Sequence, residues 1–240
     1  MRIDKLLANM NYGSRKEVKK LLKKGLITVN GTPIKDAKKH VNTDSDLIAV
    51  AGDEVKYIEH IYLMMNKPGD VISATEDVSH RTVLDLLEED EAAFSPFPVG
   101  RLDKDTEGLL LLTNDGQLTH RLLSPNKHVP KTYFAIVKGR VTATDQQMFS
   151  QGVTLDDGYV TKPAELTILV SNERSEIELT ITEGKYHQVK RMFEAVDKQV
   201  VYLKRIKMGS LCLDENLSLG EYRALNIEEL EALEMDSPSH

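Results

Sequence analysis

Residues that can act as acids, bases or nucleophiles gather in one stretch, residues 98–116, with the sequence P-V-G-R-L-D-K-D-T-E-G-L-L-L-L-T-N-D-G. Its second half holds four leucines between a glycine and the turn signal Asn-Asp-Gly, a pattern typical of a short buried strand. Charged side chains beside a buried strand cost free energy unless they have partners or a function. A strand end holds its side chains firmly, so a carboxylate here is a candidate for catalysis. The charged residues of the first half are Arg101, Asp103, Lys104, Asp105 and Glu107.

The same stretch resembles the active-site motif of the bacterial rRNA pseudouridine synthase family, in the branch of ribosomal small-subunit pseudouridine synthase A. The matching letters are G-R-L-D-x-D-T-x-G-L-L-L-L-T-N-D-G, without a gap. The resemblance implies that Asp103 is the catalytic nucleophile, and it makes Arg101 a candidate contact to the substrate RNA. Composition alone would leave Asp103 as one of several solvated loop acids. Whether this carboxylate attacks the sugar or the base stays open.

Two further motifs of the family match later segments. In Lys131-Thr132-Tyr133 the resemblance implies that Tyr133 lies under the target base, although a lone strand tyrosine is more often a core residue. Near the end of the chain, Leu203 matches a family position that lines the uracil pocket. An N-K-P segment also matches the family, and its Lys67 is interpreted as mainly structural.

The third motif is E-G-K-Y-H-Q-V-K-R-M-F-E-A, a predicted helix after a turn. The position of Lys190 carries the cation that pairs with the catalytic aspartate in the family, and in much of the wider superfamily it is arginine. Lysine keeps the charge but loses the bidentate fork. The partner of Asp103 is therefore either Lys190 or Arg191, which is also a candidate RNA contact. His187 is expected to hydrogen-bond at the helix start, and the pair His187-Gln188 favours the small-subunit branch over its large-subunit relatives, which tend to show Asn-Arg there.

The N-terminal residues 1–40 hold eleven Lys and Arg against three Asp and Glu, although the whole chain has a net charge of −7. Ser14 and Glu17 form a capping-box pattern before a helix, and Asn30-Gly31 predicts a hairpin turn. Two small helices and a hairpin with a basic face resemble the S4 RNA-binding domain. Clustered cations neutralise phosphates and release counterions, so we expect RNA contacts from Arg15, Lys16, Lys19 and Lys20.

The two resemblances together imply an α+β protein with an S4 domain over residues 1–58 and a catalytic domain over residues 59–240, built on a mixed, largely antiparallel curved sheet flanked by helices. The chain has a single cysteine, Cys212, so no intrachain disulfide can form, which suits a reducing cytoplasm. No apolar run approaches the roughly 20 residues that span a bilayer. No motif indicates a metal or a nucleotide, so we expect no cofactor.

The resemblance implies an isomerase that converts a uridine of small-subunit (16S) ribosomal RNA to pseudouridine. We expect it to act as a cytoplasmic monomer, within an assembly intermediate. One alternative is a large-subunit (23S) rRNA synthase of the same branch. Another is a non-catalytic S4-type RNA-binding or ribosome-assembly protein, against which the intact R-L-D-K-D-T stretch counts.

Removal of residues 1–58 should weaken RNA binding and flatten its dependence on salt, because each lost phosphate contact removes about 0.7–0.9 from the slope of log affinity against log salt concentration. Binding titrations of the full chain and the truncated chain at several salt concentrations measure this slope. An unchanged slope would show that this segment is not the RNA anchor.

Overall fold

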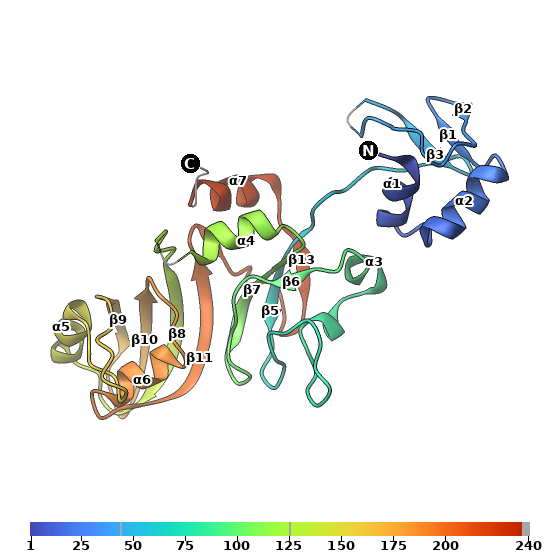
Figure 1. Cartoon of the computed structure of the whole chain (residues 1–240). Helices are drawn as coiled ribbons and strands as arrows, with labels where there is room; N and C mark the ends of the chain where they lie inside the picture. Colours follow the sequence, from blue (N-terminus) through green and yellow to red (C-terminus); the bar gives the residue numbers. More distant parts are fainter. Residues whose placement is uncertain (44, 125, 237–240) are drawn as a thin grey trace. The chain divides into compact units, whose positions relative to one another are not determined.

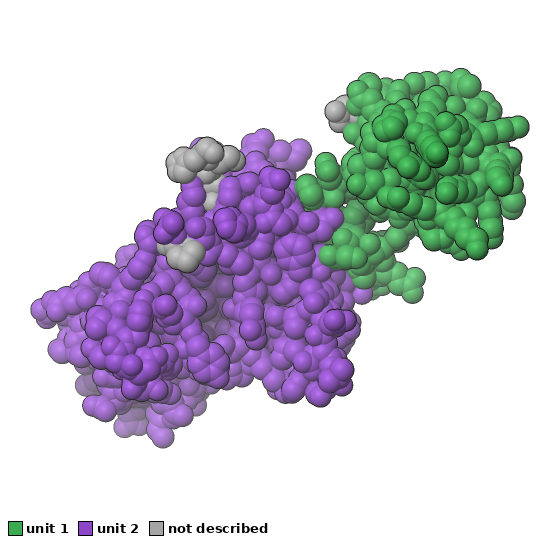
Figure 2. Space-filling model, in the orientation of Figure 1, with its two compact units in different colours: residues 1–61, 88–95 green, residues 62–87, 96–240 purple. Residues whose placement is uncertain are grey.

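The structure is a computed structural model that describes residues 1–43, 45–124 and 126–236. The chain falls into two compact units, coloured separately in Figure 2. Residues 1–61 and 88–95 form the first unit, and residues 62–87 and 96 onward form the second. The predicted boundary between residues 58 and 59 stays a prediction, and the sequence did not indicate that residues 88–95 group with the first unit.

Among the described residues, the first unit contains three helices, one of them in the grouped segment 88–95, and a small antiparallel sheet of order β2-β1-β3-β4 (Figure 1). The predicted capping box is present: the Ser14 hydroxyl accepts a hydrogen bond from the Glu17 amide, and the Glu17 side chain accepts one from the Ser14 amide. Asn30 and Gly31 both have positive φ, as the hairpin turn requires. The elements are α1 Ile3–Asn9, α2 Arg15–Lys23, β1 Ile27–Val29, β2 Thr32–Pro33, β3 Ile48–Val50, β4 Asp53–Glu54 and, in the grouped segment, α3 Glu89–Ala92.

The second unit is built on one sheet of order β13-β5-β7-β11-β8-β10-β9, with β6 paired to β7 and β12 to β11. The β7–β11 pair is parallel and the other pairs are antiparallel, which confirms the predicted mixed, largely antiparallel sheet. The strands are β5 Tyr62–Lys67, β6 Phe97–Pro98, β7 Glu107–Thr113, β8 Lys131–Lys138, β9 Glu165–Val170, β10 Arg174–Ile181, β11 Gln199–Met208, β12 Leu211–Cys212 and β13 Tyr222–Ala224.

Helices flank this sheet. In Figure 1, α4 (Gly116–Leu123) and α7 (Ile227–Met235) lie side by side, and their leucines share one apolar core with β5 and β7. At the other side of the unit are α5 (Ala143–Gln151) and α6 (Gln188–Glu194). The α6 helix, which the third motif predicted, buries the apolar side chains of Val189, Met192, Phe193 and, just beyond its end, Val196. A three-residue 3-10 turn spans Leu84–Leu86.

The parallel pair at the centre of the sheet allows no side chain at Gly108. Gly108 faces Arg205 across the two strands and has φ +100°, a left-handed conformation that favours glycine. A Cβ atom added there would collide with the backbone oxygen of Arg205. The strand that follows Asp103 can therefore lie against β11 only because residue 108 is glycine.

Gly108→Ala should lower the free energy of unfolding by about 3 kcal/mol or more, because a strained φ and overpacking each cost about 1–3 kcal/mol. The matched control is Gly116→Ala at the first position of α4, where an added Cβ meets nothing within 4 Å. That variant should stay within about 1 kcal/mol of the wild type. Urea denaturation measures both, and equal stabilities of the two variants would contradict this account of β7 and β11.

Candidate active site

The loop between β6 and β7 carries Asp103, and hydrogen bonds from two buried side chains hold its backbone. The Ser73 hydroxyl donates a hydrogen bond to the Leu102 carbonyl and accepts one from the Leu102 amide, both at 3.0 Å. The Lys67 ammonium donates to the carbonyl oxygens of Lys104, at 3.3 Å, and Thr106, at 2.9 Å. These contacts hold the backbone on both sides of Asp103.

Lys67 is fully buried at the end of β5. Its third hydrogen bond goes to the Pro68 carbonyl at 2.9 Å. Burial lowers the pKa of Lys67 to about 8, against the opposing effect of the nearby carboxylates Asp105, Glu107, Asp103 and Asp70. The interpretation of Lys67 as a structural residue is confirmed: it stabilises the loop from the inside.

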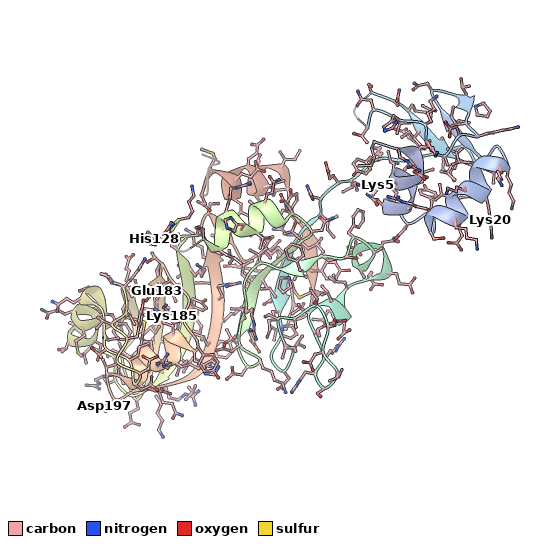
Figure 3. All side chains as sticks on the ribbon, in the orientation of Figure 1. Lys5, Lys20, His128, Glu183, Lys185 and Asp197 are labelled. Carbon is pink, nitrogen blue, oxygen red and sulfur yellow. The ribbon has the colours of Figure 1, made fainter. Side chains whose placement is uncertain are left out.

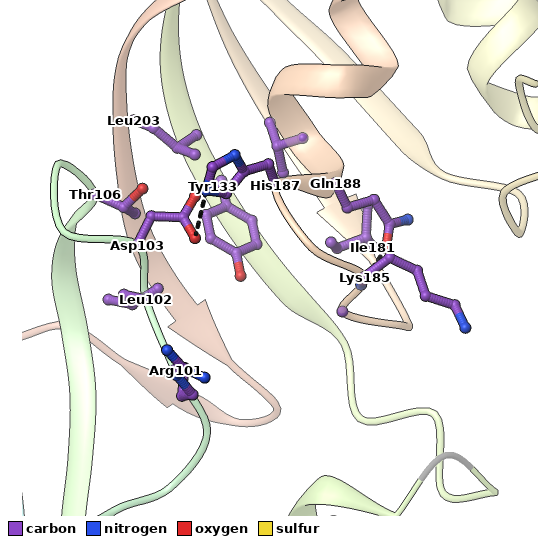
Figure 4. Close-up of a pocket in the computed structure, with 12 residues that line it drawn as sticks. Arg101, Leu102, Asp103, Thr106, Tyr133, Ile181, Lys185, His187, Gln188 and Leu203 are labelled. Atoms are coloured by element: carbon purple, nitrogen blue, oxygen red, sulfur yellow. Dashed lines mark hydrogen bonds and ion pairs between the residues drawn. The ribbon is translucent and has the colours of Figure 1, made fainter. Parts of the chain in front are cut away.

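Four segments that lie far apart in the sequence line one cavity (Figure 4). The loop supplies Asp103 and Thr106, strand β8 supplies Tyr133, strand β11 supplies Leu203, and the segment 181–189 completes the wall. Tyr133 is 8% exposed and Leu203 is 5% exposed, whereas Arg101 at the cavity wall is exposed. The arrangement is a carboxylate facing an aromatic ring and an apolar wall, which suits a flat, uncharged base. The structure thus brings Asp103, Tyr133, Leu203 and Arg101 together as the sequence predicted.

Lys190, and not Arg191, is the cation beside the catalytic candidate. Its ammonium lies 3.4 Å from Asp103 Oδ2 and 2.7 Å from Asp105 Oδ1. Burial opposes the charge on Lys190, but its hydrogen bond to Asp105 and the charges of both aspartates raise its pKa. Burial would raise the pKa of Asp105, and the hydrogen bond and charge of Lys190 lower it overall. One ammonium therefore serves two carboxylates, of which Asp105 is the nearer and the more exposed.

Arg191 points to a different pair of acids. Its guanidinium forms ion pairs with Asp156 and Asp157, and the hydrogen bonds to Asp157 and Asp156 raise its pKa. Within the described residues it makes no ion pair with Asp103, so the alternative that it partners this aspartate is wrong. Its contact with RNA stays a prediction.

His187 does not act as expected at the start of α6. Its side chain makes no cap hydrogen bond; the ring stacks on Tyr186, and Nε2 lies 3.6 Å from Asp103 Oδ1. Gln188 takes the expected role, because its Oε1 accepts from the Lys185 amide at 2.9 Å. The expectation for His187 is therefore wrong, and the ring belongs to the cavity wall. Its place three residues before Lys190 was the one signal in the sequence.

The four candidate RNA contacts of the first unit all project from α2 into solvent. Figure 3 labels one of them, Lys20. The buried face of the helix consists of Val18 and Leu22. Exposure is compatible with RNA binding and does not test it, so the contacts by Arg15, Lys16, Lys19 and Lys20 stay predictions.

Among the described residues, no group of three or more His, Cys, Asp or Glu is placed to hold a metal ion. No helix in the described parts of the chain has the length and apolar character to cross a membrane.

Comparison with known proteins defines the class. The family described as RNA pseudouridylate synthase matches residues 61–195, and the S4 domain matches residues 1–48. A solved structure titled "Crystal structure of pseudouridylate synthase" superposes with a TM-score of 0.68 at 36% identity, over 97% of this chain and 99% of that one.

Two curated relatives extend the match over nearly the whole chain. An uncharacterized RNA pseudouridine synthase of Bacillus subtilis, YtzG, is 57% identical over 97% of this chain and 98% of its own. Ribosomal small subunit pseudouridine synthase A of Escherichia coli is 38% identical over 96% of this chain and 98% of its own. The chain belongs to the S4-containing RNA pseudouridine synthases, a family of isomerases of uridine in RNA.

Lys67→Met should reduce the rise of stability with pH. The folded chain holds the pKa of Lys67 near 8, below its ordinary value of 10.5. Between these values the unfolded chain binds more protons at this residue, so the free energy of unfolding increases with pH there. From about pH 7.5 to about pH 9.5, the free energy of unfolding should therefore increase by roughly 1–2 kcal/mol less in Lys67→Met than in the wild type. Urea denaturation at both pH values measures it, with the exposed substitution Lys138→Met as control, and equal increases in wild type and Lys67→Met would refute the assignment.

Proposed function

We propose that this chain isomerises a uridine of small-subunit ribosomal RNA to pseudouridine, with Asp103 as the catalytic nucleophile. One observation supports the site above all others: Asp103 shares a cavity with the ring of Tyr133, and the Lys190 ammonium lies 3.4 Å from its carboxylate. These three residues come from three segments of the chain, and the family resemblance assigns catalytic roles to the same three.

The reaction requires a flipped base, an ionised carboxylate and no net change in atoms. Flipping costs a few kcal/mol, and stacking on an aromatic ring such as Tyr133 returns roughly 1–3 kcal/mol. The N1–C1′ bond breaks, the uracil turns, and a C1′–C5 bond forms, while the proton on C5 is lost and N1 gains one. A carboxylate at Asp103 can form a covalent intermediate or stabilise positive charge at C1′. Lys190 supports this role because its ammonium lies 3.4 Å from the carboxylate and holds it in place.

The small-subunit assignment draws on relatives and on one local feature. The Escherichia coli relative is named for the small ribosomal subunit and matches over nearly its entire length. In addition, His187 and Gln188 both have defined places at the start of α6: one faces Asp103, and the other holds the turn before the helix. We further propose that the protein acts as a monomer in the cytoplasm on an assembling small subunit, with the exposed cations of α2 as an RNA anchor.

Pseudouridine-specific chemical mapping of ribosomal RNA tests the proposal. A strain that lacks the gene should lose one signal in small-subunit rRNA, and the gene should restore it. A lost signal in large-subunit rRNA would move the activity to the other subunit. No lost signal in either RNA would favour a non-catalytic RNA-binding protein.

A further inference from the structure

A second cavity, of about 340 Å³, adjoins the one that contains Asp103, and the two share Arg101, Tyr133 and Lys185 in their walls. Its lining is rich in cations. Figure 3 labels Lys185 together with Glu183, the single acidic residue among those that line the cavity. The five cationic residues of the lining are Arg101, Lys131, Lys162, Lys185 and Arg205.

Two of these cations, Lys131 and Arg205, lie on the same face of the sheet as Tyr133. Arg205 on β11 is directly opposite Tyr133 on β8, and Lys131 is two residues before Tyr133 on β8. Side chains of opposed residues, and of residues two apart on one strand, share a face. Two residues along a strand span about 7 Å, and opposed residues on neighbouring strands lie about 5 Å apart. Lys131 and Arg205 are therefore both neighbours of the Tyr133 ring on this face.

Neither cation has an anionic partner among the described residues. Arg205 is 2% exposed; its Nε donates to the Leu109 carbonyl at 2.8 Å, and its Nη2 is buried without a hydrogen-bond partner. Lys131 donates to the Val129 carbonyl at 2.9 Å. Burial and the neighbouring charge of Arg205 lower the pKa of Lys131 to about 8. A desolvated pair of like charges is costly unless an anion joins it.

Glu183 cannot supply that anion because its oxygens are already engaged. Oε2 accepts from the Tyr159 hydroxyl at 2.6 Å, and Oε1 accepts from the Lys162 amide at 3.0 Å and from Gln188 Nε2 at 2.7 Å. A guanidinium with a free Nη2 and an ammonium beside it form a donor set that suits a phosphate group.

We propose that Lys131 and Arg205 form a phosphate site for the RNA backbone next to the target uridine, so that one phosphate is held while the base stacks on Tyr133. This assignment of an RNA phosphate rests on the proposed function, whereas the anion site itself does not. The site would hold the backbone in the position that places the base over Asp103. It acts on binding and positioning and takes no part in the chemical step.

The first test uses the full-length protein and an unmodified transcript of small-subunit rRNA. Lys131→Gln should reduce the slope of log affinity against log salt by about 0.7–0.9. It should also raise the half-saturating enzyme concentration for single-turnover conversion about tenfold or more, since a hydrogen bond to a charged group is lost. The maximal rate should stay within about threefold, and Lys131→Arg should restore both quantities. The matched control is Lys138→Gln, an exposed position on the same strand and the opposite face, which should behave as wild type.

The second test needs no uridine. Inorganic phosphate at constant ionic strength should slow acetylation of Lys131, measured by mass spectrometry, and should leave Lys138 unaffected. Protection of Lys131 in a wild-type protein that makes no pseudouridine in the transcript would show that the proposed function fails while the anion site stands.

If the slope of log affinity against log salt is unchanged in Lys131→Gln, the assignment of an RNA phosphate is wrong. If phosphate still protects Lys131 from acetylation, the site binds a free anion. If phosphate gives no protection, there is no anion site. A reduced melting temperature with unchanged slope and unchanged half-saturation would make Lys131 a structural cation only, and would also overturn the proposal.

Discussion

The active site depends on one ammonium group that is shared by two neighbouring carboxylates at the wall of a cavity. A charge that has no partner is costly to bury. The Lys190 ammonium is the partner here, because it lies within 3.4 Å of Asp103 and closer still to Asp105, whose pKa it lowers. A second cation, Lys67, lies inside the loop and donates hydrogen bonds to its carbonyl oxygens. Lys190 thus balances the charge of the two carboxylates, and Lys67 holds the backbone of the loop that carries them.

The order of the strands brings the parts of the cavity together. Strands β7, β11 and β8 are neighbours in the sheet, although they come from widely separated parts of the chain. The loop before β7 carries Asp103, β11 carries Leu203 and β8 carries Tyr133. The central parallel pair fixes the distance between the first two, through the close backbone approach at Gly108. Replacing one side chain in the cavity changes the chemistry, whereas altering the β7–β11 contact would move the whole site.

Local patterns in the sequence predicted the elements well. The four leucines of β7, the apolar face of α6 and the capping box of α2 each depend on neighbours a few residues apart, which one sequence displays. The partner of Asp103 could not be predicted in this way. Lys190 and Arg191 are adjacent on a helix, so their side chains point about 100° apart, and only the packing of α6 against β11 decides which one faces the loop. The bonds from Lys67 to the loop before β7 and the presence of Lys131 and Arg205 in one cavity also depend on segments that are far apart in the sequence, so the spacing of residues does not reveal them.

The most direct test of the catalytic assignment compares Asp103→Asn with Asp105→Asn. Asp103→Asn is nearly isosteric and leaves Lys190 its closer partner, Asp105, at 2.7 Å, so folding and RNA affinity should survive. A neutral amide can neither act as the nucleophile nor stabilise a developing cation. Single-turnover conversion of an rRNA transcript, with binding measured in parallel, should show no pseudouridine with Asp103→Asn at near wild-type affinity, and measurable turnover with Asp105→Asn. Substantial turnover by Asp103→Asn, or the reverse ranking of the two variants, would contradict the account.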